Sequence, residues 1–303
     1  MKINYNSFDD LANVWLHIYK KNYVKATTFA ESYERTVKNY ILPYFGGSET
    51  KSITPLMIRQ YLSEMALKYS DSTLSKILIC LSGIFAVAVE NNFLSKSPTD
   101  FIKLPHSSQK KKEKRTYNRQ EVDDIISFSY THENGIYIHI LLELGLRCSE
   151  LCGLKWSDID LTRKIVHIQR ACTTLHGTAN IAATKNSSSN RELPLSTELT
   201  LRLLEFKSCS CSDFIIHSKR NTDNPITPSS FTKLYYNKFF ADYGVIDWLS
   251  PHELRHTCGT LLYARTKDIY AVSKYLGHSS VNITAKLYVH SSAEILRTTL
   301  NIV

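Results

Sequence analysis

The chain has 303 residues, of which 43% are hydrophobic and 21% charged, so it can form two ordinary domain cores and lacks the composition of a disordered chain. Its net charge of +9 and pI of about 9.1 favour a polyanionic partner such as nucleic acid, because each neutralised phosphate releases counterions. No uninterrupted apolar run approaches ~18 residues, so we expect no membrane partner. The absence of a signal-peptide pattern and of disulfide spacing among the seven cysteines leads us to expect a cytoplasmic protein.

Residues 8–92 predict helices almost throughout. Apolar residues recur at spacings of three and four in "FDDLANVWLHIYKK" and in "TFAESYERTVKNYILPYFG", which should stop at Pro43 and Gly46-Gly47. Thr54-Pro55 predicts the start of a third helix, and Ser72 or Thr73 the cap of a fourth. We therefore expect a bundle of four or five helices.

A change of composition predicts a domain boundary. "SKSPTDFIKLPHSSQKKKEKRTYN" contains prolines, small polar residues and a run of basic residues, which is typical of a linker. We expect a helical domain at 1–104, a basic linker at 105–115 and a second domain at 116–303. A charge run is usually a solvated segment, but between two domains of a basic protein it can also cross a DNA backbone.

The second domain has a mixed pattern. "RQEVDDIISF" and "NGIYIHILLELGLRCSELCGL" predict helices, whereas "RKIVHIQRA", "TANIAATK" and "RELPLS" predict short strands. Helices return from about Thr197 to "KDIYAVSKYLGH". The closely spaced cysteines, Cys148 with Cys152 and Cys209 with Cys211, have no matching second pairs, so we expect small buried side chains.

The stretch "SPHELRHTCG", residues 250–259, matches the zinc-binding pattern H-E-x-x-H. Positions i, i+3 and i+4 of a helix share a face, so Arg255 would point the same way as His252 and His256 and would place a guanidinium against the dication. Leu262 stands where the longer metzincin pattern has its third histidine. We therefore expect no metal site.

As H-x-L-R-H, the same stretch favours phosphate chemistry, because an arginine donates two parallel hydrogen bonds to phosphate oxygens while a histidine moves a proton. "LGLRCSELCGL" supplies Arg147, and Glu150 three residues later could orient one of these cations. Lys185, in "ATKNSSSNRELPLS", is predicted at a hairpin turn and could serve a leaving group. "KYLGHSSVNITAKLYVH" adds His278 and, ten residues later, Tyr288.

Five features resemble, in this order along the chain, the signature of the tyrosine recombinases, also called the phage integrase family. They are G-L-R-x-S-E-L, T-K-x…R-x-L-P-L, H-x-L-R-H-T, L-G-H-S-S and a following tyrosine, and the resemblance spans about residues 118–290. The resemblance implies an α+β, mostly helical protein, with an N-terminal helical core-binding bundle and a mixed catalytic domain with a small antiparallel sheet. Ser97-Pro98 and Lys76 depart from the Asn-Pro and arginine that are frequent in the family.

The resemblance also implies a mechanism without metal, ATP or other cofactor. Tyr288 would attack a DNA phosphodiester to form a 3′-phosphotyrosine and release a 5′-hydroxyl, and a second DNA end would then attack that link. Arg147 and Arg255 would bind the non-bridging oxygens, with His278 as a further hydrogen-bond donor. Lys185 would protonate the leaving oxygen, and His252 would take the tyrosine proton. Glu150 and His256 would support the site through hydrogen bonds. The expected DNA contacts are Lys76, Lys110, Lys111, Lys112, Lys114 and Arg115.

The implied partners are double-stranded DNA at specific sites, a homotetramer on two duplexes during synapsis, and an accessory DNA-bending or directionality factor. On DNA the protein would be associated with the nucleoid. The tail "SSAEILRTTLNIV", residues 291–303, has Ala293, Leu296, Leu300 and Val303 on one face. It could dock on a neighbouring protomer or pack on its own domain.

We expect a site-specific recombinase that integrates or excises a mobile element. The chain length resembles that of chromosome-dimer-resolving recombinases, whereas "LGHSSVNITAKLYVH" resembles mobile-element integrases, so both roles stay open. A type IB topoisomerase with the same residues and a catalytically silent DNA-binding regulator are further alternatives. A zinc protease would lose activity to a chelator, whereas a recombinase should cleave DNA in EDTA.

Overall fold

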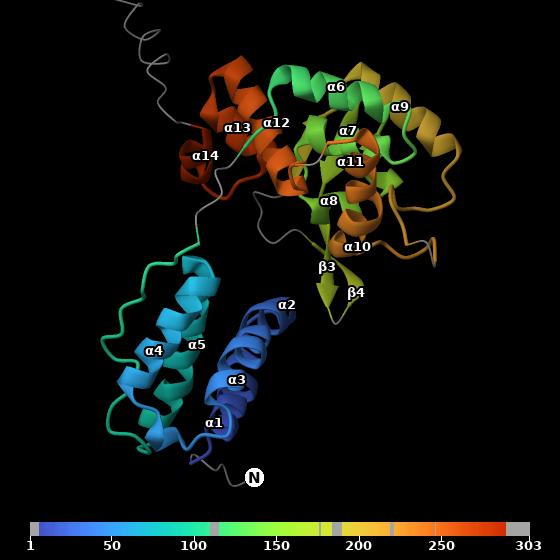
Figure 1. The fold of residues 1–303 in the computed structure, drawn as a ribbon. Coiled ribbons are helices and arrows are strands. Elements are labelled where there is room, and N and C mark those ends of the chain that lie inside the picture. Colours follow the sequence, from blue (N-terminus) through green and yellow to red (C-terminus); the bar gives the residue numbers. More distant parts are fainter. Residues whose placement is uncertain are drawn as a thin grey trace, which may run out of the picture. The chain divides into compact units, whose positions relative to one another are not determined.

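The computed structural model describes residues 6–109, 115–175, 177–183, 190–218, 221–245 and 247–288, with the backbone alone described for Ala183, Ile283 and residues 286–288. The chain divides into two compact units, residues 1–113 and 114–303, and this division falls within the predicted basic linker. Figure 1 shows the helices of the first unit in blue to teal and the elements of the second in green to red.

The first unit is a bundle of four helical runs, which confirms the expected helical bundle. In two of the runs, wider π-type turns interrupt or extend the α-helix. The runs are α1 (Phe8–Val14) with its extension Trp15–Lys20, α2 (Ala26–Thr28) continuing to α3 (Leu42–Phe45), α4 (Pro55–Lys68) and α5 (Asp71–Glu90).

Local capping sets the helix starts. Thr54 accepts a hydrogen bond from the backbone N–H of Met57 at 3.3 Å and Pro55 follows it, as predicted. The predicted cap of α5 at Ser72 or Thr73 is wrong, because the helix begins at Asp71 after Ser70. Asp71 favours this earlier start, since a carboxylate in the first turn interacts well with the positive end of the helix dipole. The second run passes through Pro43 and ends before Gly46.

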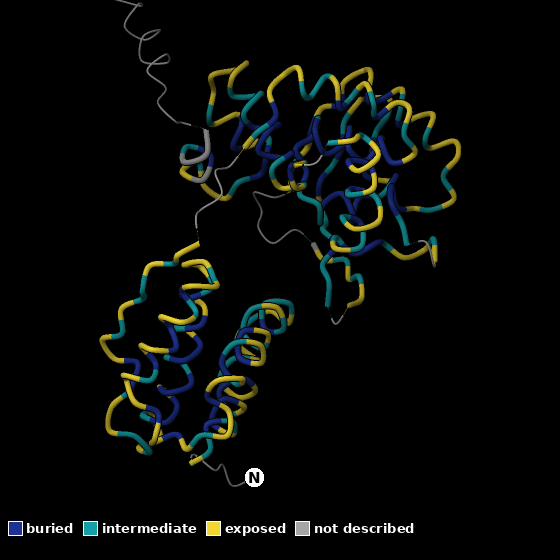
Figure 2. The backbone as a smooth tube through the Cα atoms, in the orientation of Figure 1, coloured by how far each residue is buried: buried dark blue, intermediate teal, exposed yellow. Residues whose placement is uncertain are grey.

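Aromatic side chains fill the bundle core. The ring of Phe8 lies 5.8 Å from that of Phe45 and 5.6 Å from that of Phe85, between centroids. α5 is long and apolar enough to cross a membrane by length and composition alone, with a mean hydropathy of 1.9 over 18 residues. Eight of its residues are buried in the bundle, which accounts for that composition, and Figure 2 shows the buried stretches in dark blue.

The segment after α5 packs along the bundle. Ile102 and Leu104 contact its apolar core. The backbone N–H of Ser107 donates to the Asp71 carboxylate at 2.8 Å, and the Gln109 side chain donates to the backbone carbonyl of Leu67 at 2.9 Å. The start of the predicted linker is therefore bound to the first unit as far as Gln109.

The second unit combines helices with two small antiparallel sheets, in agreement with the expected α+β class. One sheet has the order β1-β2-β5 and the other pairs β3 with β4. The strands are β1 (Ile159–Asp160), β2 (Ile165–Ile168), β3 (Arg170–Leu175), β4 (Thr178–Ala183) and β5 (Arg191–Pro194). The helices are α6 (Arg119–Ser129), α7 (Gly135–Leu144), α8 (Cys148–Gly153), α9 (Thr197–Ser208), α10 (Pro228–Phe231), α11 (Asn237–Tyr243), α12 (Pro251–Thr266), α13 (Ile269–Leu276) and α14 (Val281–Tyr288).

Two expectations about the second unit are wrong. β4 pairs with β3 and β5 with β2, so the connection that contains Lys185 does not join two paired strands, and it is not the predicted hairpin turn. Strand partners are chosen by tertiary packing, which a local strand pattern does not reveal. Cys209 and Cys211, just after α9, are exposed rather than buried, whereas Cys152 is buried.

The centre of the second unit is α7, "GIYIHILLEL", in which nine of ten residues are buried. A helix that is apolar on all sides needs other elements around it. The neighbouring α6, α8, α9 and α12 all contact it. These helices therefore take their positions from α7, and two of them, α8 and α12, carry Glu150, His252, Arg255 and His256.

Gly83 of α5 lies against the indole ring of Trp15, and a Cβ added there would be 2.6 Å from Cζ2 of the ring. Alanine favours a helix by ~1 kcal/mol over glycine, but an overpacked core costs more. We expect Gly83→Ala to lower the free energy of unfolding of the first unit by about 1–3 kcal/mol in urea denaturation. Ser72→Ala, at an exposed position of the same helix, is the control. A Gly83→Ala variant that is more stable than the natural protein would contradict this packing.

Candidate active site

α12 carries the H-x-L-R-H stretch and begins with a complete capping box. The Ser250 hydroxyl accepts from the backbone N–H of Glu253 at 3.4 Å, and the Glu253 carboxylate accepts from the backbone N–H of Ser250 at 2.7 Å. The glutamate of the H-E-x-x-H pattern is therefore engaged at the helix start. Among the residues that the structure describes, no three His, Cys, Asp or Glu side chains gather as metal ligands would.

Arg147 comes from the turn between α7 and α8. α7 ends at Leu144, and Gly145 has a φ of 57°, which glycine adopts without strain. Arg147 is the N-cap of α8, and its backbone N–H and Nη1 donate to the two carboxylate oxygens of Glu150 at 2.9 and 2.6 Å. The side chain stays 36% exposed, so a ligand can reach it.

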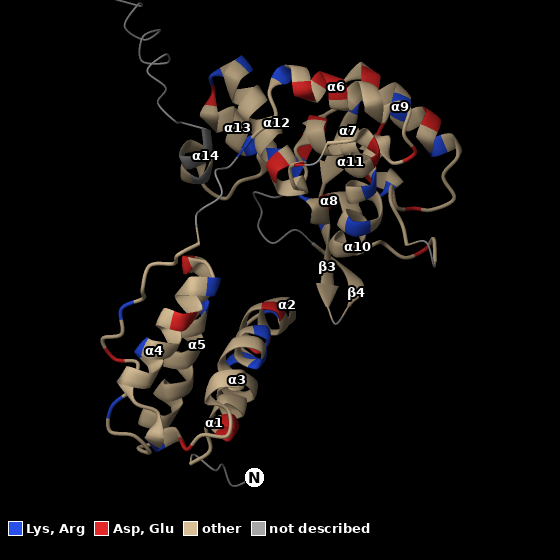
Figure 3. Ribbon diagram, viewed as in Figure 1, with Lys and Arg blue, Asp and Glu red and all other residues tan. Residues whose placement is uncertain are grey.

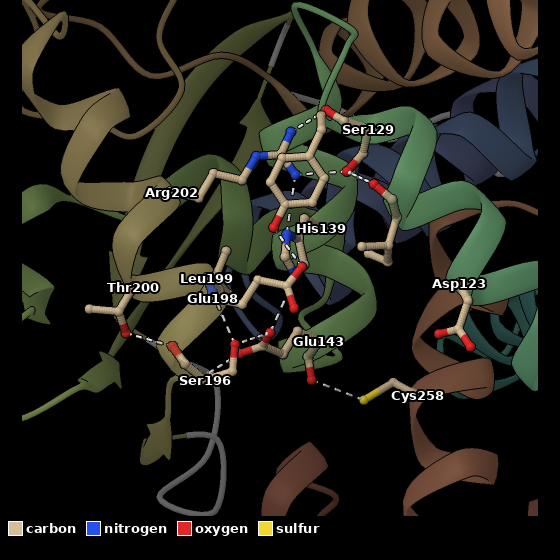
Figure 4. Close-up of polar contacts among 12 residues, drawn as sticks. Asp123, Ser129, His139, Glu143, Ser196, Glu198, Leu199, Thr200, Arg202 and Cys258 are labelled. Carbon is tan, nitrogen blue, oxygen red and sulfur yellow. Dashed lines mark hydrogen bonds and ion pairs between the residues drawn. The ribbon is translucent and has the colours of Figure 1, made fainter.

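A polar network around Glu143 anchors the end of α7, as Figure 4 shows. The Glu143 carboxylate accepts from the backbone N–H and hydroxyl of Ser196 at 2.8 and 2.7 Å and lies 3.3 Å from His139. Its backbone carbonyl accepts from the thiol of Cys258 at 3.4 Å and from the hydroxyl of Tyr275 at 3.1 Å. The network joins α7 to α9, α12 and α13 close to the turn from which Arg147 projects.

Three arginines bind three consecutive backbone carbonyl groups at the C-terminal end of α13. Arg191 Nε donates to Tyr275 at 2.8 Å, Arg255 Nη2 donates to Leu276, and Arg147 Nη2 donates to Gly277 at 3.1 Å. The last carbonyls of a helix lack intrahelical donors and carry its partial negative charge, so they favour cations. Arg147, Arg191 and Arg255 are termed the arginine cluster below, and His278 follows directly after the carbonyls that they bind.

The Glu150 carboxylate lies within the arginine cluster. It is 2% exposed and pairs with Arg147 at 2.6 Å, with Arg191 at 3.0 Å and with Arg255 at 3.8 Å. Burial acts to raise the pKa of Glu150, but the hydrogen bond and charge of Arg191 and the charges of Arg147 and Arg255 outweigh it, so the pKa is lowered. One negative charge against three positive charges leaves a site suited to a phosphate diester.

His278 lies beside the arginine cluster as a neutral imidazole. Burial, with the positive charges of Arg255 and Arg147 and the nearby His256 and His252, lowers the pKa of His278 from 6.5 to about 4. Its Nδ1 lies 2.8 Å from the hydroxyl of Thr284 in α14. When that hydroxyl donates to Nδ1, the ring proton is on Nε2 and can be donated to an oxygen.

The two histidines of α12 have different surroundings. His256 is 6% exposed and Arg255 is 1% exposed, whereas His252 is exposed. The imidazole rings of His252 and His256 nevertheless lie 4.6 Å apart between centroids. Since both also act on the pKa of His278, the structure brings Arg147, Glu150, His252, Arg255, His256 and His278 together.

Other predicted site residues are only partly described. Tyr288 is the last residue of α14, and its side chain lies outside the described part of the structure. Lys185, Lys110, Lys111, Lys112 and Lys114 lie outside the described residues altogether. Lys76 is exposed on α5, and Arg115 pairs with Glu121 and lies 5.7 Å from the ring centroid of Tyr117.

The sequence did not lead us to assign Arg191. It is the first residue of β5, within the R-x-L-P-L motif, and its side chain is 6% exposed. Its partners Glu150 and Tyr275 are 41 and 84 residues away in the chain. The available signals were its place in the family motif and at the start of a short strand, and neither of them reveals a distant ion pair.

The neutral state of His278 predicts how stability depends on pH. The folded-state pKa is depressed, so between pH 6.5 and about 4 the unfolded chain binds a proton that the folded protein does not. The stability that comes from the neutral, half-buried His278 is therefore complete above pH 6.5 and is lost as the pH falls towards 4. We therefore expect the free energy of unfolding of the natural protein to fall more steeply across this range than that of His278→Asn. Denaturant titrations at several pH values measure both slopes, and parallel slopes would contradict the assignment.

The chain matches known recombinases along most of its length. Residues 115–294 match the phage integrase family, and residues 7–66 match the N-terminal SAM-like domain of phage integrases. A XerC-like tyrosine recombinase of Caldanaerobacter subterraneus is 28% identical over 93% of this chain and 78% of the relative. The ICEBs1 integrase of Bacillus subtilis is 28% identical over 84% of this chain and 71% of the relative. The tyrosine recombinase XerC of Bacillus licheniformis is 27% identical over 98% and 95%, respectively.

Solved structures share the fold. The Tn1549 transposon integrase in complex with a circular intermediate DNA has a TM-score of 0.78 at 19% identity and covers 97% of this chain and 99% of its own. A lambda integrase tetramer bound to a Holliday junction has a TM-score of 0.68 at 17% identity and covers 93% and 77%. These likenesses show the fold, and the family match spans more than half of the chain. The chain belongs to the phage integrase family, the tyrosine recombinases, as its motifs predict.

Proposed function

We propose that this protein cuts and rejoins double-stranded DNA at specific sites, with the Tyr288 oxygen as nucleophile. The tyrosyl oxygen forms a bond to the scissile phosphorus and the bond to the 5′-oxygen breaks, which leaves a 3′-phosphotyrosine. A 5′-hydroxyl of a second DNA end then attacks the same phosphorus and releases the tyrosine. Each step exchanges one phosphodiester for another, so no ATP is consumed.

The proposed roles are those that the family resemblance implies, and the placement of Arg147, Arg255, His252 and His278 supports theirs. Arg147 and Arg255 donate to the non-bridging oxygens, and the neutral His278 donates from Nε2 as negative charge grows in the transition state. His252, exposed near that site, takes the tyrosine proton, and Lys185 gives a proton to the departing 5′-oxygen. A phenol with a pKa near ~10 needs such a base and neighbouring cations to attack at neutral pH.

One observation carries the proposal: Arg147 and Arg255 bind the carbonyls directly before His278 and share the Glu150 carboxylate. Arg147 is 36% exposed and is the arginine that an arriving phosphate meets first. Arg255 is 1% exposed, so its surroundings must shift before a phosphate oxygen reaches it. The backbone of α14 places Tyr288 one turn after Thr284, which contacts His278.

Charge supports DNA as the substrate and limits where it can bind. α6 carries Glu121, Asp123 and Asp124 with Arg119 as its one basic residue, and Figure 3 shows this acidic helix in the second unit. Phosphates avoid such a face. Lys76 has no acidic neighbour in the sequence, and it remains a proposed DNA contact together with the basic linker. The charge of Arg115 is partly compensated by Glu121. Affinity from these contacts should fall steeply with salt.

We further propose integration or excision of a mobile element as the biological role. The likeness to the ICEBs1 integrase and to the Tn1549 integrase supports this role. Chromosome-dimer resolution is the second candidate, supported by the likeness to XerC proteins across nearly the full length of both chains. Neighbouring genes and flanking repeats distinguish the two, since an element integrase should lie inside a segment bounded by direct repeats. Work on DNA also implies a cytoplasmic, nucleoid-associated protein.

A homotetramer on two duplexes is the proposed assembly, with an accessory DNA-bending or directionality factor. The lambda integrase tetramer on a Holliday junction supports the tetramer. The tail, residues 291–303, lies outside the described residues, and its apolar positions Leu296 and Leu300 are proposed to dock on a neighbouring protomer.

Tyr288→Phe should abolish the covalent DNA adduct while leaving DNA affinity unchanged, because only the attacking oxygen is removed. Labelled nicked duplexes that carry candidate sites are incubated with protein in EDTA, and the adduct is separated on a denaturing gel. Tyr270→Phe, at a 57% exposed tyrosine of α13, is the matched control and should still form the adduct. An adduct with Tyr288→Phe, or cleavage that stops in EDTA, would sink the proposed mechanism.

Deletion of residues 291–303 should weaken the pairing of two sites and leave single-site binding intact, because the tail is proposed to contact another protomer. Native gels with one-site duplexes and with paired duplexes measure the two properties. Leu296→Ala with Leu300→Ala is the milder version of the same change. Equal loss of both properties would indicate that the tail instead packs on its own domain.

A further inference from the structure

Arg191 is the member of the arginine cluster to which the proposed chemistry gives no role. Its Nη1 and Nη2 donate to the two oxygens of Glu150 at 3.2 and 3.0 Å. Its Nε donates to the backbone carbonyl of Tyr275 at 2.8 Å. One side chain of β5 thus holds both the carboxylate of α8 and the C-terminal end of α13.

These two contacts are with the groups that orient the phosphate-binding arginines. Glu150 pairs with Arg147 and Arg255, and the carbonyls after Tyr275 accept from the same two side chains. A planar guanidinium that spans both oxygens fixes the plane of a carboxylate, whereas a single contact lets the carboxylate turn. Arg147 also donates to both oxygens of Glu150, but it is the N-cap of the same helix, so Arg191 is the donor that ties this carboxylate to β5 and to the end of α13. Without Arg191, the pair of Arg147 and Glu150 could shift together away from the phosphate.

The charges that act most strongly on His278 are those of Arg255 and Arg147. His278 lies where the phosphate is proposed to bind, and Arg147 and Arg255 donate to the two carbonyls directly before it, whereas Arg191 donates to Glu150 and Tyr275. In the proposed function, Arg147 and Arg255 bind the substrate, and Arg191 holds the groups that orient these two arginines.

We propose that Arg191 is a positioning residue, which aims Arg147 and Arg255 at the scissile phosphate by holding Glu150 and the end of α13. This inference rests on the proposed function. A displacement of about 1 Å in a catalytic group can reduce a rate on the order of 10²-fold. DNA affinity comes from many phosphate contacts and should change little.

The test compares Arg191→Met with Arg170→Met. Arg170 of β3 donates at 3.0 Å to the fully buried carboxylate of Asp158, so its loss breaks a comparable ion pair without touching the cluster. The substrate is the nicked duplex on which the natural protein forms its adduct. The single-turnover rate of adduct formation at saturating protein and the dissociation constant for the same duplex are measured, at a temperature where each variant is folded. Arg191→Met should lose roughly 100-fold in rate with a dissociation constant within about threefold of the natural protein, whereas Arg170→Met should keep its rate.

A second substrate separates positioning from general damage to the fold. In it, a methylphosphonate replaces the scissile phosphate, so one charged non-bridging oxygen is absent. If Arg191 acts through the arginines that neutralise that charge, the rate loss in Arg191→Met should be several-fold smaller on this substrate, because the two changes affect the same interaction. Arg170→Met should show the same rate ratio on both substrates.

Arg191→Lys keeps the positive charge but cannot span both oxygens of Glu150 and reach Tyr275 as well, so it should fold and still lose about tenfold in rate. A natural rate in Arg191→Lys, or equal rate losses in Arg191→Met and Arg170→Met, would overturn the positioning role. Absence of any adduct with the natural protein would instead refute the proposed function itself.

Discussion

The second unit depends on one carboxylate, that of Glu150, which holds three guanidinium groups close together. Arg147, Arg191 and Arg255 would repel one another in a buried site if Glu150 did not lie within 2.6 to 3.8 Å of each. Removing one partner of a buried ion pair typically costs ~3–5 kcal/mol, because the remaining charge loses both water and its counter-charge. The three arginines also satisfy three successive carbonyls at the end of α13, so the same interaction fixes the position of His278.

Each element around this cluster contributes through the position that it gives to one or two side chains. α7 is the buried support, and the network around Glu143 holds its end to α9, α12 and α13. β5 begins with Arg191, and α13 ends at the carbonyls that the arginines bind. The contact between His278 and Thr284 links the same cluster to α14, the helix that carries Tyr288. A local change in any of these elements therefore alters the relative positions of the reacting groups.

The electrostatics of the site suit a reaction in which negative charge grows on a phosphate. The cluster keeps an excess of positive charge after Glu150 is counted, and burial together with this charge lowers the pKa of His278 and keeps it neutral. A neutral imidazole donates a hydrogen bond without adding a further buried charge. In the proposed function these groups contact one phosphate and read no base, so the specific affinity for DNA would have to come from other contacts.

The amino-acid sequence by itself determined the features that depend on neighbours in the chain. These include the helical bundle, the capping box of Ser250 and Glu253, the glycine stop after α7, and the ordered motifs that mark the family. Tertiary structure alone decided which strands pair, and so removed the expected hairpin turn at Lys185. It also decided that His256 is buried while His252 is exposed. Helical spacing puts both residues on one face of α12, but it does not say how far along that face the neighbouring elements cover the helix. The partnership of Arg191 with Glu150 was hidden for the same physical reason: the two residues are 41 positions apart, and only the packing of β5 beside α8 and α13 brings their charges together.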